Sequence, residues 1–248
     1  TGKAWTKPVL HLLTLPLDYV LHLPYHDLVS VANFRFLVDT FAMLDRGHRK
    51  GWLSHVVTST EEKRQYLESH GIDAQFLPVG QQPFFGEDLH TPRDIDALFI
   101  GSLKSKRRRL QMKHLMARLS ALGLTTYIPD KPVWGEARTK LVNRAKILVH
   151  MHNFEWDTPW MRWNLAAANG AAIASPPLSV PHPMRPGVDY LSASIEELAD
   201  DIHALVQDEP RRQQMVAACQ ATMFEHMTCA RSVALLARQF DNLLQQRG

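Results

Sequence analysis

Residues 96–110 read DALFIGSLKSKRRRL, and this stretch contains the clearest strand, turn and helix signals of the chain. The apolar run Asp96–Ile100 predicts a short buried strand, and Gly101-Ser102 predicts a tight turn after it. A helix follows the turn, because apolar residues then recur every three or four positions until Gly123: Met112, Leu115, Met116, Leu119 and Leu122. A strand that leads through a tight turn into a helix is typical of a parallel sheet covered by helices.

The same alternation continues toward the C-terminus. Further strands are predicted at Leu124–Ile128, Lys146–His152 and Ala171–Ser175, and further helices at Gly135–Ala145 and Pro159–Ala168. Asn169-Gly170 is a helix-ending signal. The sequence therefore predicts an α/β fold with a Rossmann-like parallel sheet.

The last third of the chain is predicted to be helical. After a proline-rich loop, Ser194-Ile195-Glu196-Glu197 has the pattern of a capping box and opens a helix that ends near Gln207. Two more helices are expected at Pro210–His226 and Cys229–Arg247.

The first ninety residues have a different texture, with many His and Pro residues and a helical piece around Asp27–Arg49. A strand–helix–strand unit is predicted from His55 to Val79, with a capping box at Ser59–Glu62 and a helix at Lys63–His70. Gly80–Pro92 is predicted to be a linker. We therefore expect a partial N-terminal α/β domain over residues 1–92, a Rossmann-like domain over 93–228, and a C-terminal helix over 229–248 that packs back toward the N-terminal part.

Composition limits the class of protein. The chain has 248 residues, of which 45% are hydrophobic, so it can bury a core. No uninterrupted apolar run reaches the length of a membrane span. Cys219 and Cys229 have no metal or redox spacing, and we expect reduced core thiols and a cytoplasmic protein. The start at Thr1 suggests a cropped or processed chain. A net charge of +3 does not by itself argue for nucleic acid.

Cations crowd the start of the helix that follows Gly101-Ser102. Lys104–Arg109 holds five cations in six residues. Because a helix N-terminus favours negative charge, by about 0.3–1 kcal/mol for each charge, an anion is expected to compensate. A diphosphate resting on the turn fits this position. The alternative is a solvated basic surface.

A second polar group follows the predicted strand that ends at His152. Asp157 or Thr158 is expected to be an N-cap and Pro159 the first helical residue. Arg162 would then lie in the first turn, where it could bind a phosphate or a carboxylate. Pairing of Arg162 with Asp157 or Glu155 is the alternative.

The same segment offers candidates for acid–base and metal chemistry. Glu155 and Asp157 are acid–base candidates by position, although no nucleophile motif accompanies them. His150 and His152 share one face of a strand, but no third ligand stands at a sensible spacing, so no metal is expected.

In the N-terminal part, polar groups stand beside apolar ones and could face an acceptor. They are Pro24-Tyr25-His26-Asp27 and Asp45-Arg46-Gly47-His48. A local pair between Asp45 and Arg46 at a helix end is the alternative.

Four stretches together resemble a known family: DALFIGSLKSKRRRL, WGEARTKLVNRAKILVHMH, TPWMRWNLAAANGAAIAS and GVDYLSASIEELADDI. They are similar to the C-terminal domain of bacterial GT-B glycosyltransferases related to the spore-maturation-protein type. The likeness covers roughly residues 94–235. Upstream, LPLDYV, MLDRGH and FLPVG look like the later part of the acceptor domain of such an enzyme, whose opening strands would be absent.

The resemblance implies a sugar nucleotide in the C-terminal domain and an acceptor on the N-terminal side. The diphosphate would be bordered by Gly101, Ser102, Lys104, Arg107, Arg108, Thr158 and Arg162. The base would lie near Tyr127, Pro129 and Val133. The catalytic candidates are His152, Glu155 and Asp157, and the acceptor-side candidates are His26, Asp45, Arg46 and His48.

The resemblance further implies transfer of a sugar from a nucleoside diphosphate to an acceptor hydroxyl, without a metal or other cofactor. One departure is clear: many retaining members have two glutamates eight positions apart, where this sequence has Asp157 and Leu165. A non-catalytic module that binds a nucleotide or an anionic glycan is therefore an alternative. A nucleic-acid-binding or nucleic-acid-modifying protein is a second alternative, disfavoured because no aromatic platform accompanies the basic run.

Overall fold

The computed structural model describes residues 42–53, 56–78, 80–153 and 158–245. The chain divides into two compact units. The first, which we call the sheet unit, is Val79–Cys229, and the second, the flanking unit, is Thr1–Pro78 together with Ala230–Gly248. The predicted domain boundary after residue 92 falls inside the sheet unit.

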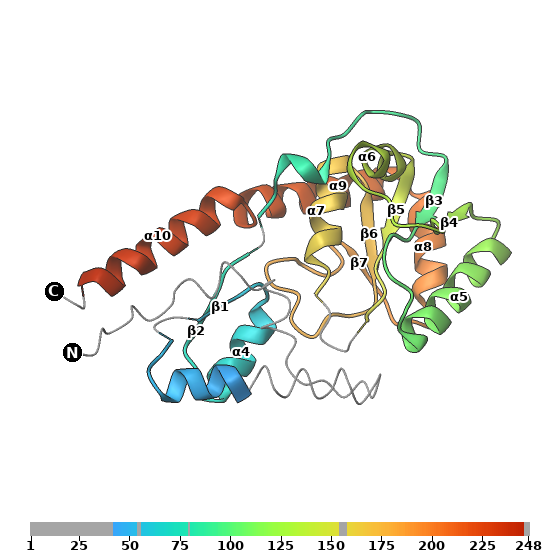
Figure 1. Cartoon of the computed structure of the whole chain (residues 1–248). Helices are drawn as coiled ribbons and strands as arrows, with labels where there is room; N and C mark the ends of the chain where they lie inside the picture. The colour runs from blue at the N-terminus through green and yellow to red at the C-terminus, as the bar shows by residue number, and fades with distance from the viewer. Residues whose placement is uncertain (1–41, 54–55, 79, 154–157, 246–248) are drawn as a thin grey trace. The chain divides into compact units, whose positions relative to one another are not determined.

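The sheet unit is built on five parallel strands in the order β4-β3-β5-β6-β7 (Figure 1). The strands are β3 Ile95–Leu98, β4 Thr126–Tyr127, β5 Ala145–Val149, β6 Ala172–Ser175 and β7 Leu191–Ser192. The predicted parallel α/β sheet is confirmed. Strand β7 is not predicted from the sequence, because two paired residues are too short to show a periodic pattern.

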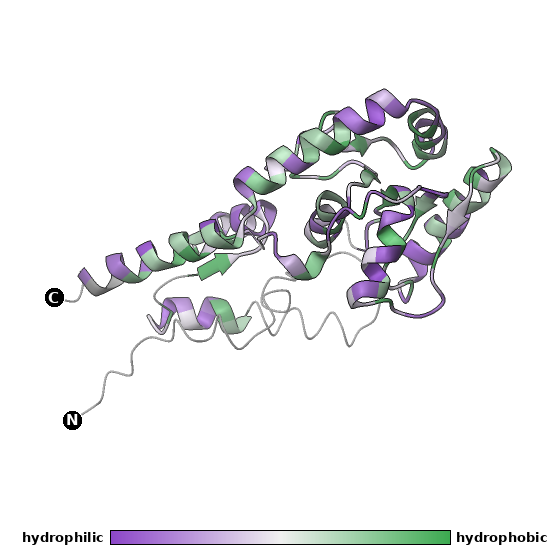
Figure 2. Ribbon diagram, turned by 90° about the horizontal axis from the view of Figure 1, so that it is seen from above, coloured by the Kyte–Doolittle hydropathy of each residue, from purple (hydrophilic) through white to green (hydrophobic). Residues whose placement is uncertain are grey.

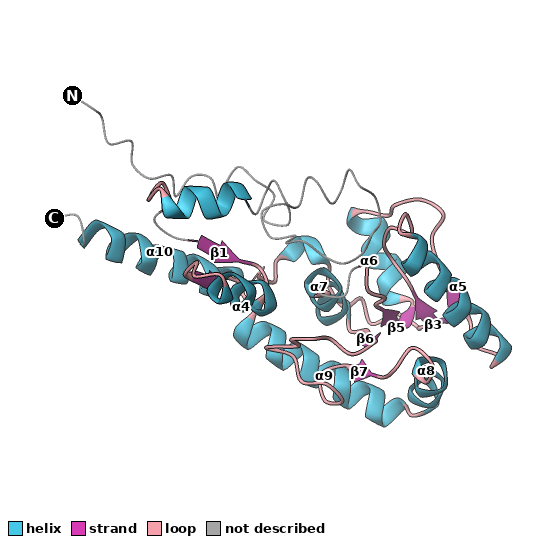
Figure 3. Ribbon diagram, turned by 90° about the horizontal axis from the view of Figure 1, so that it is seen from below, coloured by secondary structure: helices cyan, strands magenta, loops and turns pink. Residues whose placement is uncertain are grey.

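Helices cover both faces of this sheet. Figures 1 and 3 show α5 (Lys106–Ala121) and α8 (Leu198–Gln207) on one face, and α6 (Gly135–Asn143) and α7 (Trp160–Asn169) on the other. The long helix α9 (Glu209–His226) packs against α7, α8 and β6. Alternate strand residues enter the core under α5 and α8, among them Ala97, Phe99, Ile147 and Val149.

Two helix starts differ from the prediction. Pro159 is the N-cap of α7 rather than its first residue, and its ψ of 38° lies outside the helical range, so Thr158 is not the cap. At the other site Glu197 N donates to Ser194 Oγ at 3.3 Å, but Ser194 Oγ itself donates to the Glu197 carboxylate at 2.7 Å. The reciprocal bond of a capping box is therefore missing, and α8 begins at Leu198.

The predicted linker is instead a strap that belongs to the sheet unit. It begins where Gln81 N donates to the Met227 carbonyl oxygen at 2.6 Å, beside a bridge between Gln81 and Thr228. A Cβ on Gly80 would lie 2.0 Å from Cys229 N, so the two segments touch backbone to backbone. A short 3-10 helix, η1 (Pro83–Phe85), follows and buries Phe85.

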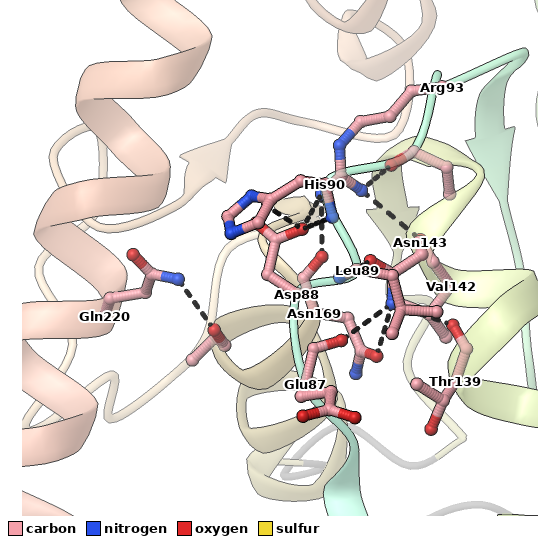
Figure 4. Close-up of polar contacts among 12 residues, drawn as sticks. Glu87, Asp88, Leu89, His90, Arg93, Thr139, Val142, Asn143, Asn169 and Gln220 are labelled. Atoms are coloured by element: carbon pink, nitrogen blue, oxygen red, sulfur yellow. Dashed lines mark hydrogen bonds and ion pairs between the residues drawn. The ribbon is translucent and has the colours of Figure 1, made fainter. Parts of the chain in front are cut away.

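Two buried asparagines hold the middle of the strap (Figure 4). Asn143 Oδ1 accepts from Leu89 N at 2.7 Å, and Asn143 Nδ2 donates to the Glu87 carbonyl oxygen at 2.9 Å. Asn169 Nδ2 donates to the Phe85 carbonyl oxygen at 2.9 Å, and the two amides bond to each other at 2.9 Å. The strap backbone is thereby paired with side chains at the ends of α6 and α7.

Two arginines fasten the strap further. Arg93 donates to the carbonyl oxygens of Ala145 and Asn169, both at 2.7 Å, and Arg138 donates to that of Phe84 at 2.5 Å. Burial lowers the pKa of both guanidinium groups, although an arginine stays protonated at neutral pH. Long-range side-chain bonds of this kind have no local sequence signature. The sequence therefore predicts a linker where the structure has a strap.

The flanking unit contains the predicted strand–helix–strand motif. Strands β1 (Val56–Thr58) and β2 (Ala74–Phe76) pair in parallel, and α4 (Glu61–Ser69) connects them. Thr60 caps α4 by accepting from Lys63 N at 3.3 Å. Residues 42–49 form another helix, while the earlier part of the predicted Asp27–Arg49 helix lies outside the described residues.

The last described helix is α10, Cys229–Gln245. Figure 2 shows hydrophilic and hydrophobic turns alternating along it toward the C-terminus. Within the flanking unit, Ser232 Oγ donates to the Pro78 carbonyl oxygen at 2.6 Å. No described helix is long and apolar enough to span a bilayer.

Candidate functional site

The candidate site lies where the parallel strands end. Leu98 of β3 is in register with Tyr127 of β4 and Leu148 of β5, so the residues that follow these strands emerge at one edge of the sheet. This edge therefore gathers the turn after β3, the end of β4 and the residues after β5. Ligands of open parallel sheets bind at this edge.

Arg162 joins the ends of β3 and β5. Its Nη2 donates to the Ile100 carbonyl oxygen at 3.0 Å, and its Nη1 donates to His150 Nδ1 at 3.1 Å. Because a guanidinium has only donors, His150 Nδ1 accepts and carries no proton. The guanidinium carbon also lies 5.1 Å from the centre of the Phe99 ring, within cation–π range. Helix α7, which covers one face of the sheet, thus places a fixed cation beside the β3–α5 turn.

Arg108 approaches the same turn from α5. It is 6% exposed, and its Nη1 donates to the Ser102 carbonyl oxygen at 3.3 Å. Its guanidinium carbon is 6.0 Å from the Phe99 ring, so two cations flank one aromatic ring. Ser105 caps α5 by accepting from Arg108 N at 3.4 Å. Arg108 therefore supports the turn from inside.

The predicted diphosphate residues of the turn are on the surface. Gly101, Ser102, Lys104 and Arg107 are all exposed at the start of α5. A Cβ on Gly101 would lie only 2.3 Å from Arg162 Nη2, so glycine is needed here for the close approach of the guanidinium. The structure thus brings the exposed turn and Arg162 together, and it turns Arg108 inward.

The remaining predicted residues of this edge are placed as follows. Tyr127 is 46% exposed at the end of β4, and Pro129, Val133 and Thr158 are half-buried. His152 is 8% exposed and its ring centre is 5.1 Å from that of His150. The described residues contain no group of three His, Cys, Asp or Glu side chains that could hold a metal ion.

The structure does not describe every predicted residue. Glu155, Asp157 and His26 lie outside the described residues. Leu165, which stands where the resemblance implied a glutamate, is buried at 2% exposure inside α7. No carboxylate can therefore approach a ligand from that position.

The described acceptor-side candidates belong to the flanking unit. Asp45 pairs with Arg49 at 2.9 Å, one helical turn away, and not with Arg46 as the alternative reading proposed. Arg46 is exposed and His48 half-buried. No polar contact among the described residues joins these three candidates.

Two members of the site are not predicted from the sequence. The Phe99 ring lies within cation–π range of both Arg108 and Arg162, and the Ile100 carbonyl oxygen accepts from Arg162. Phe99 lies in a run that reads as ordinary strand core, and a backbone carbonyl has no residue signature. The one sequence signal for this contact is the position of an aromatic residue directly before Ile100-Gly101.

The sequence was compared with known protein families and with curated proteins. The protein-family model described as glycosyl transferase-like matches residues 104–238. No curated protein matches the sequence significantly.

Solved structures share the fold. TarM superposes with a TM-score of 0.66 at 11% identity, covering 82% of this chain and 46% of TarM. HepE of Anabaena, crystallised with UDP and glucose, gives 0.63 at 12% identity, with 88% and 70% covered. Sucrose-phosphate synthase of Thermosynechococcus elongatus gives 0.62 at 12% identity, with 78% and 59% covered.

These likenesses concern the fold, and the chain spans only about half the length of TarM and somewhat more of the synthase. The neighbours are GT-B glycosyltransferases, as the resemblance implied. The family match itself extends over more than half of the chain and includes the β3–α5 turn from Lys104 and all of α7. The chain is therefore a member of the glycosyl transferase-like family, with a GT-B type α/β fold.

Proposed function

We propose that the protein transfers a sugar from a nucleoside diphosphate donor to an acceptor hydroxyl, without a metal ion. One observation carries the proposal: Arg162 crosses from α7 to the β3–α5 turn and fixes a guanidinium beside exposed Gly101 and Ser102. Departure of a diphosphate develops negative charge, which fixed cations and helix N-terminal amides stabilise more in the transition state than in the ground state.

The proposal gives the cations different parts. Arg162 and the exposed Lys104 and Arg107 would face the diphosphate, while Arg108 would hold the Ser102 carbonyl so that the turn keeps its shape. Tyr127, Pro129 and Val133 would border the base. Glu155, Asp157 and His152 remain the candidates for acid–base assistance at the sugar.

UDP is the first nucleotide to test, because structurally similar proteins were crystallised with it: HepE with UDP and glucose, and a pneumococcal O-GlcNAc transferase with UDP and GlcNAc. We expect UDP, GDP or ADP to raise the melting temperature of the wild-type protein. A nucleotide at about 100 times its dissociation constant adds roughly 2.7 kcal/mol of stability.

Substitution tests the assignment. Arg162→Ala and Arg107→Ala should each reduce the thermal shift, whereas Arg211→Ala, an exposed cation of α9, should leave it unchanged. Shifts of wild-type size for all three nucleotides in both site variants would exclude this diphosphate site. Activity with added EDTA tests metal independence.

A non-catalytic nucleotide-binding module is the second candidate, favoured by buried Leu165 where the resemblance implied a glutamate. Both candidates predict nucleotide binding. They differ in turnover: release of UDP from a UDP-sugar above the uncatalysed rate indicates an enzyme, and binding without release indicates the module.

A further inference from the structure

The positive charge of this protein is concentrated in one segment. Residues 97–129 contain seven Lys and Arg residues and no Asp or Glu. The rest of the chain has 21 cations and 25 acidic residues, a net charge of −4. The modest total of +3 therefore conceals a strongly basic segment, and six of its seven cations lie in α5.

Arg108 and Arg118, two of the seven cations, contact other parts of the fold. Arg108 turns inward to the Ser102 carbonyl oxygen. Arg118 crosses to α8, where its Nη2 lies 2.8 Å from Asp200 Oδ2 and its Nη1 donates to the Glu196 carbonyl oxygen. These contacts account for Arg108 and Arg118 but not for the exposed cations of the helix.

Three cations form one outward face of α5. Lys106, Arg109 and Lys113 are exposed and stand three and four positions apart, which places them on one side of the helix over about 10 Å. Leu110, 55% exposed, lies among them. None of the three forms an ion pair with any residue that the structure describes, and the one polar contact found for their side chains is a 3.4 Å bond from Arg109 to the Leu103 carbonyl oxygen.

In two other helices, α4 and α6, cations form ion pairs with acidic residues one helical turn away. In α4, Arg64 bonds to Glu61 and Glu68, and in α6, Lys140 lies 2.6 Å from Glu136. Such pairs at three or four positions stabilise a helix, by about 0.2–0.5 kcal/mol each. The outward face of α5 has no such pair among the described residues, and Lys106 and Arg109 stand in the first turn, where the helix dipole disfavours positive charge. Stability of the helix does not explain this face.

We propose that the outward face of α5, defined by Lys106, Arg109 and Lys113, binds an anionic polysaccharide. Lys- and Arg-rich patches suit polyanions, because each contact releases a counterion. A single exposed leucine is too little to enter a lipid layer, and α5 has no Phe, Tyr or Trp on which a base could stack. The choice of a glycan over other polyanions rests on the proposed glycosyl transfer, since such an enzyme handles glycans.

The test measures binding, with heparin and polygalacturonate as sulfated and carboxylated probes and a DNA duplex for comparison. The triple variant Lys106→Gln, Arg109→Gln, Lys113→Gln removes the face. We expect binding of both glycans to weaken by about tenfold or more, and the slope of log affinity against log salt to fall by about 2, for three contacts of about 0.7 each.

A matched variant controls for net charge. Lys140→Gln, Arg211→Gln, Arg238→Gln removes three exposed cations elsewhere, so both variants have a formal net charge of zero in place of +3. Glycan binding should persist in this control. Equal losses in the two variants would overturn the proposal, as would tighter binding of the duplex than of either glycan.

The UDP thermal shift, measured on the same variants, separates this proposal from the proposed function. Lys106, Arg109 and Lys113 are not among the donor-site residues, so the shift should persist in the triple variant. Loss of glycan binding with a normal UDP shift supports the α5 face, whether or not the wild-type protein transfers sugar. Unchanged glycan binding refutes the face even if UDP binds.

Discussion

At the scale of single residues, the site depends on one long side chain that is held at both of its terminal nitrogens. Arg162 reaches the Ile100 carbonyl oxygen and His150 Nδ1, and it leaves no room for a Cβ on Gly101. A guanidinium with fixed direction loses less freedom when an anion binds than a mobile lysine does. Its effect on donor binding should therefore depend on geometry as well as charge.

Gly101→Ala tests the geometric part. The added methyl would lie 2.3 Å from Arg162 Nη2 and 3.1 Å from Phe99 Cζ, so the guanidinium must move. We expect at least a tenfold loss of UDP affinity, measured by titration calorimetry, with a stability cost of about 1–3 kcal/mol. Arg162→Lys, which retains the charge without the fork, should show a similar loss. Wild-type affinity in Gly101→Ala would contradict this role of the close approach.

The two cysteines should differ in reactivity. Burial raises the pKa of the Cys219 thiol to about 12, whereas Cys229 is exposed. Since the thiolate is the reactive form, iodoacetamide at neutral pH should label Cys229 in the folded protein and Cys219 only after unfolding, as mass spectrometry can show. Cys229→Ser should then give an unlabelled native protein. Rapid native labelling of Cys219 would refute its burial as a neutral thiol.

The same shift sets a pH dependence of stability. The folded protein keeps the Cys219 proton up to about pH 12, while an unfolded thiol loses it near its ordinary value of 9.0. The contribution of this group is therefore fully present below about pH 9 and decreases as the pH rises toward 12, because the unfolded state alone is ionised. Urea unfolding across this range should show a shallower decline in Cys219→Ala. An equal decline in both proteins would count against it.

At the scale of elements, the strap over α6 and α7 is held by two buried side-chain amides. Asn143 and Asn169 are fully buried, and together they satisfy the strap carbonyls of Phe85 and Glu87 and the amide of Leu89. Removing a member of such a network leaves buried polar groups without partners, which costs more than the lost bond itself.

Asn169→Leu tests this network. It deprives the Phe85 carbonyl of its side-chain partner, while Asn143 Nδ2 keeps the Glu87 and Thr139 carbonyls. We expect a loss of about 1–3 kcal/mol in the free energy of unfolding, for one orphaned buried group. Gln214→Leu, exposed on α9, should change it by less than about 0.5 kcal/mol. Denaturant titration compares the two; similar values would mean that the strap is not held by these amides.

Elements also show where sequence reasoning succeeds. The apolar repeat of Met112, Leu115 and Leu119 identified α5 because a helix buries residues at that spacing. Gly101-Ser102 likewise predicted the β3–α5 turn. The inward turn of Arg108, the bond from Arg162 to Ile100 and the amides under the strap join residues far apart in sequence or depend on rotamers. No local pattern encodes such contacts.

At the scale of the whole molecule, the chain enters and leaves the sheet unit once each. Val79–Cys229 contains all five strands of the larger sheet, the strap and the candidate donor site. Its core is formed by its own strands and helices. A compact unit with its own core can in principle fold alone.

We therefore expect a fragment of residues 79–229 to fold independently. It should show one cooperative thermal transition by circular dichroism and retain the UDP-induced shift of the full chain, because the β3–α5 turn and Arg162 are both within it. A fragment that folds cooperatively but fails to bind UDP would place essential donor contacts in the flanking unit.

The start of the strap has a consequence for engineering and for evolution. Gly80 and Gln81 lie directly against Met227, Thr228 and Cys229, so the first and last residues of this module are neighbours. A few residues suffice to join them, and a circular permutant opened at another surface loop should retain the fold. The same closeness lets such a cassette be grafted into a loop of a foreign scaffold with little displacement of the host backbone.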